Sequence, residues 1–331
     1  MAHEFDYMSA SEMRLRVGRK DISPVALTQR ALERAGETEP RLNAFFELMP
    51  ESALAAAQSA EDAVMKGGTL GALHGIPLSV KDLIAVGDVR FALGSKTMAE
   101  NIATEDAPAV ERARAAGGIV IGKTTTSEFG CKPVGDSPLT GITRNPWNTD
   151  KTPGGSSAGA AASVAAGVTP FALGTDGGGS VRIPSAFTGL AGIKGSFARV
   201  PVWPTSATPT LAHVGPLARN VRDAALLFSA IAGYDARDPF SIAGDVPDVL
   251  EACEQSVEGM RVAWSPTLGY ARPNDDVVAV VEAAVRKFED AGAIVCSCFQ
   301  VGEKQIACAI NEGKSTVQAL GESLKCGTNC G

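Results

Sequence analysis

Short, largely apolar runs alternate with helical segments along most of this chain, and this alternation restricts the folds open to it. The runs Gly75–Val80, Ile119–Ile121 and Pro170–Leu173 have the length and composition of strands buried on both faces. The segments Ser52–Lys66 and Ala107–Ala116 carry alanine-rich helical patterns ahead of two of these runs. This order predicts an α/β fold in which a mixed β-sheet is flanked by helices on both sides.

Capping residues and hydrophobic periodicity predict further elements towards both ends of the chain. They are, in chain order, a helix from Ser23-Pro24 to about Gly36, a helix from Asn220 to about Gly233, a strand at Met260–Trp264, a long amphipathic helix at Asp275–Gly292 and a strand at Ala293–Val295. With these elements the alternation extends to about residue 295, where the character of the sequence changes.

The composition is that of an ordinary globular protein and disfavours two classes of partner. The 331 residues are 45% hydrophobic and 20% charged, with a net charge of −7. This acidic balance weighs against nucleic acid and anionic lipid as partners. Residues 1–20 lack the continuous apolar core of a signal peptide, and no run of about 18 apolar residues occurs. We therefore expect a cytoplasmic protein without a membrane or nucleic-acid partner.

Two glycine–serine segments carry the clearest chemical signal in the sequence. They are Pro153–Gly159 and Gly174–Arg182, and the second follows an expected strand directly. Consecutive glycines allow positive φ angles, so several backbone N–H groups can point at one spot, as an oxyanion requires. A single such loop is more often a structural turn or a phosphate cradle. Two loops together with Lys81 at a strand end favour a hydrolase with a serine nucleophile.

The base that would activate such a serine is more plausibly a lysine than a histidine. The chain has only three histidines, His3, His74 and His213. His3 lies near the terminus, and the other two lie in turn-like contexts. The sequence therefore gives little support for a Ser–His–Asp triad. A lysine can act as the base if burial keeps it neutral. Lys81 follows an apolar run and is well placed for burial.

At these positions the sequence resembles the amidase signature family. The family's three signature segments correspond to Val80–Asp82, Gly154–Gly159 and Gly174–Arg182, with spacings of 75 residues from Lys81 to Ser156 and 24 from Ser156 to Ser180. Further segments whose sequences resemble the family are His74–Pro77, Ile121–Thr124, Glu128-Phe129, Thr143–Trp147 and His213–Pro216. The resemblance covers about residues 5–295.

The resemblance implies a specific catalytic arrangement. Ser180 would attack the amide carbonyl, and Ser156, after a cis peptide bond, would pass the proton of Ser180 to neutral Lys81. The backbone N–H groups of Gly177, Gly178 and Gly179, with that of Ser180, would form the oxyanion hole.

The family also implies roles for residues around these three. Gly130, after the Glu-Phe pair, would contact the substrate. Ser157 and Asp176 would support the loops by hydrogen bonding, with Arg182 as an ion partner. We expect Ser157, Asp176 and Arg182 to be structural rather than chemical.

Three further features are interpreted without a catalytic or nucleotide-binding role. Gly117–Thr124 matches the nucleotide P-loop pattern G-x(4)-G-K-T, but it follows a helix and its middle is the β-branched run Ile119–Ile121, typical of a strand. Cys131 has no obvious histidine partner and is expected to line the acyl pocket. Asp82 is expected to hold local structure beside Lys81.

The sequence suggests three regions. Residues 1–65 form an N-terminal helical region, 66–295 the catalytic core, and 296–331 an atypical tail that does not resemble the family and that we interpret as truncated or unrelated. The tail cysteines are Cys296, Cys298, Cys308, Cys326 and Cys330. Their C-x-C and C-x(3)-C spacings do not fit paired zinc knuckles, and an odd count disfavours a disulfide framework. We expect no metal and no cofactor.

The leading functional hypothesis is an amidohydrolase that forms an acyl-enzyme on Ser180 and acts on a small-molecule amide. The sequence is compatible with a homodimer. A second hypothesis is the A subunit of a tRNA-dependent amidotransferase, which takes ammonia from glutamine. The sequence of Gly195–Val200, which departs from the one common in such subunits, disfavours this second hypothesis. A third is an inactive scaffold that keeps the motifs without a working pocket.

Overall fold

The computed structural model describes residues 3–256, 262–286, 294–296, 301–302, 309–314 and 316–324. The chain divides into two compact units, Met1–Glu254 and Gln255–Gly331. The expected catalytic segments all belong to the first unit. Among the described residues, no helix has the length and hydrophobicity needed to cross a membrane.

A mixed six-stranded sheet forms the centre of the first unit, counted over its described residues, in the order β1-β3-β2-β6-β8-β7. Strands β3, β2 and β6 are parallel, and β1, β8 and β7 pair antiparallel with their neighbours. The strands of this sheet are β1 (Phe45–Leu48), β2 (Pro77–Lys81), β3 (Ile119–Thr124), β6 (Phe171–Thr175), β7 (Ala191–Gly192) and β8 (Val214–Ala218). A separate two-stranded ribbon consists of β4 (Asp136–Ser137) and β5 (Gly141–Ile142).

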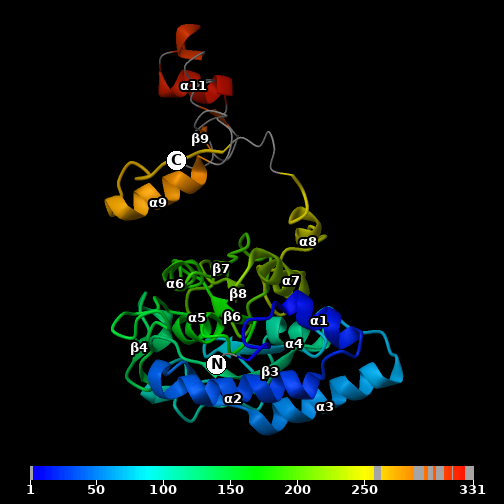
Figure 1. Cartoon of the computed structure of the whole chain (residues 1–331). Coiled ribbons are helices and arrows are strands. Elements are labelled where there is room, and N and C mark those ends of the chain that lie inside the picture. Colours follow the sequence, from blue (N-terminus) through cyan, green and yellow to red (C-terminus); the bar gives the residue numbers. More distant parts are fainter. Residues whose placement is uncertain are drawn as a thin grey trace. The chain divides into compact units, whose positions relative to one another are not determined.

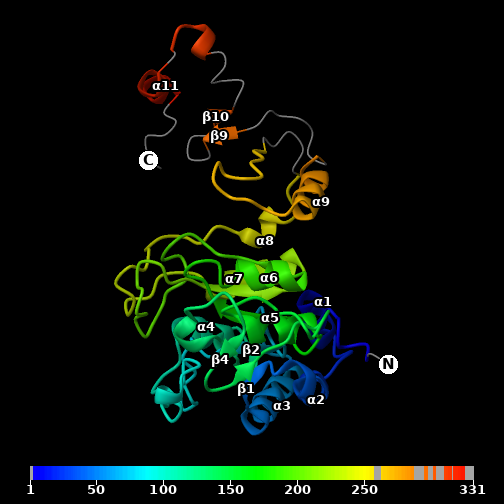
Figure 2. The ribbon, with the colours of Figure 1, turned by 90° about the vertical axis from the view of Figure 1, so that its left-hand side faces the viewer.

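Helices cover both faces of this sheet (Figure 1). The α-helices of the first unit are α1 (Ala10–Gly18), α2 (Pro24–Leu42), α3 (Pro50–Lys66), α4 (Pro108–Ala115), α5 (Ala158–Ala165), α6 (Arg182–Thr188), α7 (Val221–Ile231) and α8 (Val249–Ala252), and its 3₁₀ turns are η1 (Lys96–Met98) and η2 (Glu128–Gly130). Helices α2 and α3 pack together and against β3, whereas α7 packs against β8, β7 and β6 (Figure 2).

The alternation of side chains along the strands explains this two-sided packing. Leu78 and Val80 of β2 belong to the core cluster that also contains residues of α4 and α7. Ile119 and Ile121 of β3 belong to the cluster formed with α2 and α3. Because successive side chains of a strand point to opposite faces, both faces of the sheet must be covered by apolar groups. The α/β class with a mixed sheet and flanking helices is confirmed.

The parallel strands bring three polar residues to one edge of the sheet. Lys81, Thr124 and Thr175 are the last residues of β2, β3 and β6, and Lys81 pairs in register with Thr124. Since carboxyl ends of parallel strands meet at the same edge, this is where an open α/β sheet presents a ligand site.

Helix α2 is longer than the sequence pattern indicates. Its Ser23 side chain accepts hydrogen bonds from the N–H groups of Val25 and Ala26, as an N-cap does, and the helix continues past Gly36 to Leu42. Asn43 ends it in the left-handed conformation with a φ of 50°. A glycine with ordinary helical backbone is therefore only a weak stop signal.

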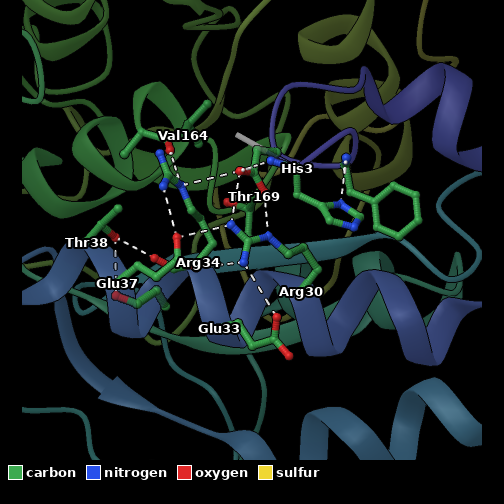
Figure 3. A network of polar contacts seen from close by, with 12 residues as sticks. His3, Arg30, Glu33, Arg34, Glu37, Thr38, Val164 and Thr169 are labelled. Atoms are coloured by element: carbon green, nitrogen blue, oxygen red, sulfur yellow. Dashed lines mark hydrogen bonds and ion pairs between the residues drawn. The ribbon is translucent and has the colours of Figure 1, made fainter. Parts of the chain in front are cut away.

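The N-terminal segment is bound to α2 by a polar network (Figure 3). Arg30 donates from Nε and Nη2 to the buried carboxylate of Asp6, at 2.7 and 3.0 Å, while its Nη1 donates to Glu37 at 2.8 Å. The N–H of His3 also donates to Asp6. Burial tends to raise the pKa of Asp6, but hydrogen bonds from Arg30 and His3 lower it overall.

A second set of contacts joins this start of the chain to the far end of the sheet. The carboxylate of Asp223, in the first turn of α7, accepts from the N–H groups of Ala10 and Ser11 at 2.8 and 3.0 Å. Arg219, just after β8, donates to the carbonyl of Met8 at 2.7 Å. Residues separated by more than 200 positions in sequence thus hold α1 in place.

The second unit contains α9 (Asp275–Val285), the antiparallel pair β9 (Ile294–Cys296) and β10 (Val301–Gly302), and α11 (Val317–Leu324). The strand expected at Met260–Trp264 is wrong for residues 262–264, which are irregular, and its first two residues lie outside the described chain. The last residues of the helix expected at Asp275–Gly292 also lie outside it, as do Cys298, Cys308, Cys326 and Cys330.

Candidate active site

Lys81 is the centre of a cluster of hydroxyl groups at the carboxyl ends of β2 and β6. Its side chain is fully buried. Its Nζ atom lies 2.7 Å from Ser156 Oγ, 3.0 Å from Ser157 Oγ and 2.8 Å from Thr175 Oγ1. The cluster thus joins the end of β2, the residues just before α5 and the end of β6.

The surroundings of Lys81 favour its neutral form. Burial lowers the pKa of this amine well below its usual range, and the carboxylate of Asp176 only partly opposes the effect. No carboxylate within the described chain forms an ion pair with Lys81. A neutral amine has one lone pair and can accept a proton.

The hydroxyl partners fix where that lone pair points. Ser157 donates its hydroxyl proton to the carbonyl of Thr175 at 3.1 Å and accepts from the N–H of Thr175 at 3.2 Å. Ser157 Oγ must therefore accept from Lys81. If the second N–H of the neutral amine goes to Thr175 Oγ1, the lone pair is left for the hydroxyl of Ser156. The sequence pattern did not single out Thr175, although it stands in the Gly174–Arg182 segment.

Ser156 is held by a crowded glycine segment. The Gly155–Ser156 peptide bond is cis. A Cβ atom on Gly155 would lie 2.3 Å from the carbonyl oxygen of Val134, and one on Gly159 would lie 2.1 Å from that of Ala44. Only glycine fits at these two positions, because the main chain of neighbouring segments passes against them.

Asp176 organises the second glycine–serine loop. Its carboxylate accepts from the N–H groups of Gly179 and Val181, at 2.7 and 3.1 Å, and from Arg182 Nε and Nη2, at 3.0 and 2.9 Å. Burial tends to raise the pKa of Asp176, but the hydrogen bonds from Arg182 and from the backbone lower it to about 2. Asp176 is therefore charged, and its carboxylate stabilises the loop instead of transferring protons.

The structure departs from the expected oxyanion hole at Gly179. Its N–H already donates to Asp176, so it is not free to bind an oxyanion. The N–H groups of Gly177, Gly178 and Ser180 have no hydrogen-bond partner among the described residues. Three of the four expected donors are thus available.

Ser180 lies beside the cluster without being joined to it. Its hydroxyl has no hydrogen-bond partner in the described part of the chain, and its carbonyl accepts from the N–H of Ser157 at 3.3 Å. Ser156 and Ser180 nevertheless line the same cavity. In enzymes without substrate, catalytic hydrogen bonds are often long and form only in the complex.

That cavity has a volume of about 300 Å³ and a largely apolar wall. Its apolar side chains include Leu83, Ile84, Phe91, Phe129 and Trp203. An apolar cavity with a few convergent polar groups is the usual form of a small-molecule site.

Gly130 and Cys131 stand where the cavity meets the Lys81 cluster. Gly130 has a φ of 71°, and a Cβ on it would lie 2.6 Å from Leu83 Cδ1 and 3.3 Å from Ser156 Oγ. Cys131 is a free, exposed thiol that also lines the cavity. Gly130 thus keeps the space in front of Ser156 open.

Asp82 and Lys123 form a buried ion pair beside the site, with Nζ 3.1 Å from Oδ1. Burial raises the pKa of Asp82 against the opposing effect of Lys123, and burial lowers the pKa of Lys123. Asp82 also accepts from the N–H groups of Ala92 and Gly94. Lys123, the lysine of the P-loop pattern, is thus enclosed at the end of a strand and is not available to a nucleotide.

Comparison with known proteins places these features in a family. Residues 26–309 match the Amidase family, and residues 294–331 match the BFD-like [2Fe-2S] binding domain, so that 294–309 are shared by both matches. The second match weighs against the expectation of a tail without metal. Among the described residues, no group of three or more His, Cys, Asp or Glu is arranged to hold a metal ion.

Curated relatives include an acylamidase of Rhodococcus erythropolis, 40% identical over 288 residues, and the A subunit of a glutamyl-tRNA(Gln) amidotransferase from Nitrosococcus oceani, 37% identical over 288 residues. These alignments cover 87% of this chain but only 60% and 59% of the relatives. The chain therefore spans about three fifths of the length of these proteins.

Solved structures of similar fold include a bacterial aryl acylamidase of the amidase signature family, with a TM-score of 0.83 and 30% identity, covering 97% of this chain and 68% of that one. A peptide amidase from Stenotrophomonas maltophilia gives a TM-score of 0.77 at 28% identity, covering 98% and 69%. Together with the match over residues 26–309, these similarities show that the chain belongs to the amidase signature family.

Proposed function

We propose that this chain carries the catalytic groups of an amidohydrolase that cleaves a small-molecule amide to an acid and ammonia or an amine. The observation that supports this most directly is the buried Lys81 amine, 2.7 Å from the hydroxyl of Ser156 and without an ion-pair partner among the described residues. Such an amine can act as a base near neutral pH, whereas an exposed lysine cannot.

In the first half of the reaction, the hydroxyl oxygen of Ser180 attacks the amide carbon. Its proton passes to Ser156, and Ser156 passes its own proton to the Lys81 nitrogen. The carbonyl oxygen becomes an oxyanion bound by the free N–H groups of Gly177, Gly178 and Ser180. The tetrahedral intermediate then collapses, the carbon–nitrogen bond breaks, and the leaving nitrogen takes a proton back from Lys81 through Ser156.

In the second half, water replaces the departed amine. It loses a proton to Lys81 by the same route and attacks the acyl-enzyme ester. Collapse of the second intermediate releases the acid and returns the proton to Ser180. Both halves use each group as base and then as acid, so the net proton balance on the protein is zero.

Labelling of the full chain with a fluorophosphonate probe tests this proposal. An adduct on Ser180 that is abolished in Ser180→Ala and strongly reduced in Lys81→Ala is the expected result. Ser59→Ala serves as a matched control, since Ser59 is an exposed helical serine bonded only to its own helix. Absence of labelling in folded protein would contradict the proposal and favour the inactive scaffold.

A second candidate activity is that of a glutaminase within a larger complex, because several relatives are named as the A subunit of glutamyl-tRNA(Gln) amidotransferase. Ammonia release from glutamine that requires partner proteins would favour this candidate. Hydrolysis of simple amides by the chain alone would favour the amidohydrolase.

For residues 294–331 we propose binding of a 2Fe–2S cluster, on the basis of the family match. Cysteine thiolates are the usual ligands of such clusters, which take four, and this segment offers Cys296, Cys298, Cys308, Cys326 and Cys330. Their side chains lie outside the described structure, and the cluster would supply one-electron transfer.

Iron and sulfide analysis of the full chain, purified without oxygen, tests the cluster proposal together with visible absorption. Loss of iron in Cys298→Ser and retention in Cys253→Ser is the expected result. If the chain contains no iron after purification from iron-supplemented cells, the cluster proposal is contradicted.

The cellular location and the oligomeric state are also proposals. Cell fractionation tests a cytoplasmic location, and light scattering of the purified chain tests a homodimer. Recovery of the chain in the membrane fraction would contradict the first.

A further inference from the structure

His213 lies immediately before β8 and faces the loop that carries Ser180. Its Nδ1 atom is 3.0 Å from the carbonyl oxygen of Asp176 and 2.8 Å from that of Leu211. Its own carbonyl accepts from the N–H of Asp176 at 2.9 Å. His213 therefore binds both backbone groups of Asp176: its ring binds the carbonyl, and its own carbonyl binds the N–H.

These contacts determine which ring nitrogen of His213 carries a proton. Carbonyl oxygens only accept hydrogen bonds, so Nδ1 must be protonated and shared between its two acceptors. Nε2 lies 3.3 Å from Lys194 Nζ, which also donates to the carbonyl of Gly195 at 2.9 Å. An ammonium group can only donate, so Nε2 of the neutral ring accepts from Lys194.

The hydrogen bond to the Asp176 carbonyl also acts on the next residue. In a planar trans peptide the C=O and the following N–H point in opposite directions. Holding the Asp176 carbonyl towards His213 therefore directs the N–H of Gly177 away from His213. That N–H has no partner among the described residues, and Gly177 lines the cavity with Ser180.

No other side chain in the described structure donates to this carbonyl. Gly177 and Gly178 have no side chains that would limit rotation of the peptide, and a Cβ on Gly178 would meet nothing within 4 Å. Asp176 fixes the later part of the loop through Gly179 and Val181, but its carboxylate does not reach the Gly177 N–H.

We propose that His213 is a positioning residue, which holds the Asp176–Gly177 peptide so that the Gly177 N–H faces the oxyanion of the amide or ester undergoing attack by Ser180. This inference rests on the proposed function. His213 takes no proton in the reaction, and its role is to donate one hydrogen bond from Nδ1.

Substitutions of similar size separate this role from general packing. In His213→Asn the side-chain amide nitrogen can occupy the place of Nδ1, so the donor is kept. In His213→Leu the donor is lost, and in His213→Gln the amide lies nearer the place of Nε2. Phe197→Leu is the matched control, because Phe197 packs edge-on against the His213 ring, with centroids 5.9 Å apart, without taking part in the hydrogen bond.

The measurements are the rate of fluorophosphonate labelling of Ser180 and kcat and KM for an anilide substrate, each on the full chain. Loss of one oxyanion donor costs about 10²–10³ in kcat, so a misdirected donor should cost at least about tenfold. We expect this loss in His213→Leu and His213→Gln, with KM little changed. His213→Asn should recover most of the rate, and Phe197→Leu should keep it.

Equal labelling rates in the wild-type chain and in folded His213→Leu and His213→Gln would overturn the inference while leaving the proposed function standing. So would a loss in His213→Asn as large as that in His213→Leu. If His213→Leu does not fold, the labelling rate of His213→Gln tests the inference in its place. A wild-type chain that is folded and not labelled would overturn the proposed function, and this inference with it.

Discussion

The amine of Lys81 and the hydroxyl of Ser156 lie 2.7 Å apart although 75 residues separate them in sequence. Lys81 ends a buried strand, and Ser156 follows a cis peptide bond just before α5. The pair is buried, and Lys81 also contacts two further hydroxyl groups, from Ser157 and Thr175. A lysine in such a place lowers the stability of the fold, because water that would solvate its charged form is excluded.

Replacing Lys81 by Met should raise stability at neutral pH while strongly reducing the labelling of Ser180. Burial lowers the pKa of Lys81 in the folded protein, so the unfolded chain binds a proton there that the folded chain does not. The stability of the wild-type chain should therefore rise with pH up to about 10.4, the pKa of a free lysine. The advantage of the Met variant should shrink over that range.

Thermal unfolding of both proteins at several pH values measures this difference. Lys66→Met, at an exposed lysine, should follow the wild-type pH dependence throughout. Parallel pH profiles for the wild type and Lys81→Met would show that Lys81 is charged in the folded protein.

The labelling rate of Ser180 should rise with pH and level off well below about 10.4, the pKa of a free lysine. Only the neutral amine can accept the proton of Ser156, and the lowered pKa of Lys81 makes it neutral at lower pH than a free lysine. A rate that continues to climb to the pKa of free lysine would contradict this assignment.

Ser156→Ala should slow labelling of Ser180 by about 10²–10⁴, the usual contribution of general acid–base catalysis. The substitution removes the hydroxyl that bridges to Lys81 and leaves the glycine segment unchanged. Circular dichroism should show an intact fold. An unchanged rate in folded Ser156→Ala would exclude the bridging role.

Asp176→Asn should lose stability near neutral pH but not in strong acid. The pKa of Asp176 is lowered to about 2 in the folded protein, against about 3.9 in the unfolded chain. Its contribution is therefore present above about pH 4 and is lost as the pH falls towards 2. We expect about 1–2 kcal/mol, reduced because Arg182 is exposed to solvent. Equal destabilisation at all pH values would contradict the charge-based explanation.

Breaking the buried pair of Asp82 and Lys123 should be costly, at about 3–5 kcal/mol for Asp82→Asn, because Lys123 is left buried without its counter-ion. The double variant Asp82→Asn, Lys123→Met should recover much of this loss in denaturant unfolding. Lys132→Met, which removes an exposed pair with Asp136, should cost less than about 1 kcal/mol. A double variant as unstable as Asp82→Asn would argue against an electrostatic origin.

The strands that lead into the candidate site could be predicted because their signals are local. The apolar run before Lys81 and the glycine segment before Ser180 each indicate a strand followed by a functional turn, and the structure has β2 and β6 there. The family expectation is confirmed by the comparison with known proteins. The mechanism assigned to these residues stays a prediction.

What could not be predicted depends on register and hydrogen-bond direction. Thr175 reaches Lys81 because β2 and β6 pair in parallel, and Lys123 meets Asp82 because β3 lies on the other side of β2. The commitment of the Gly179 N–H to Asp176 depends on how the loop folds back on its own carboxylate. None of these pairings leaves a periodic or compositional trace in the sequence.

The attachment of α1 to the far end of the sheet has a consequence for synthesis of the chain. Asp223 and Arg219, which hold Ala10, Ser11 and Met8, are translated more than 200 residues later. While the ribosome makes the intervening sequence, the apolar face of α1 cannot reach its native partners in α7. The emerging polypeptide therefore carries the α1 segment without its native contacts until Arg219 and Asp223 have been made, a state in which chaperones and proteases can bind it.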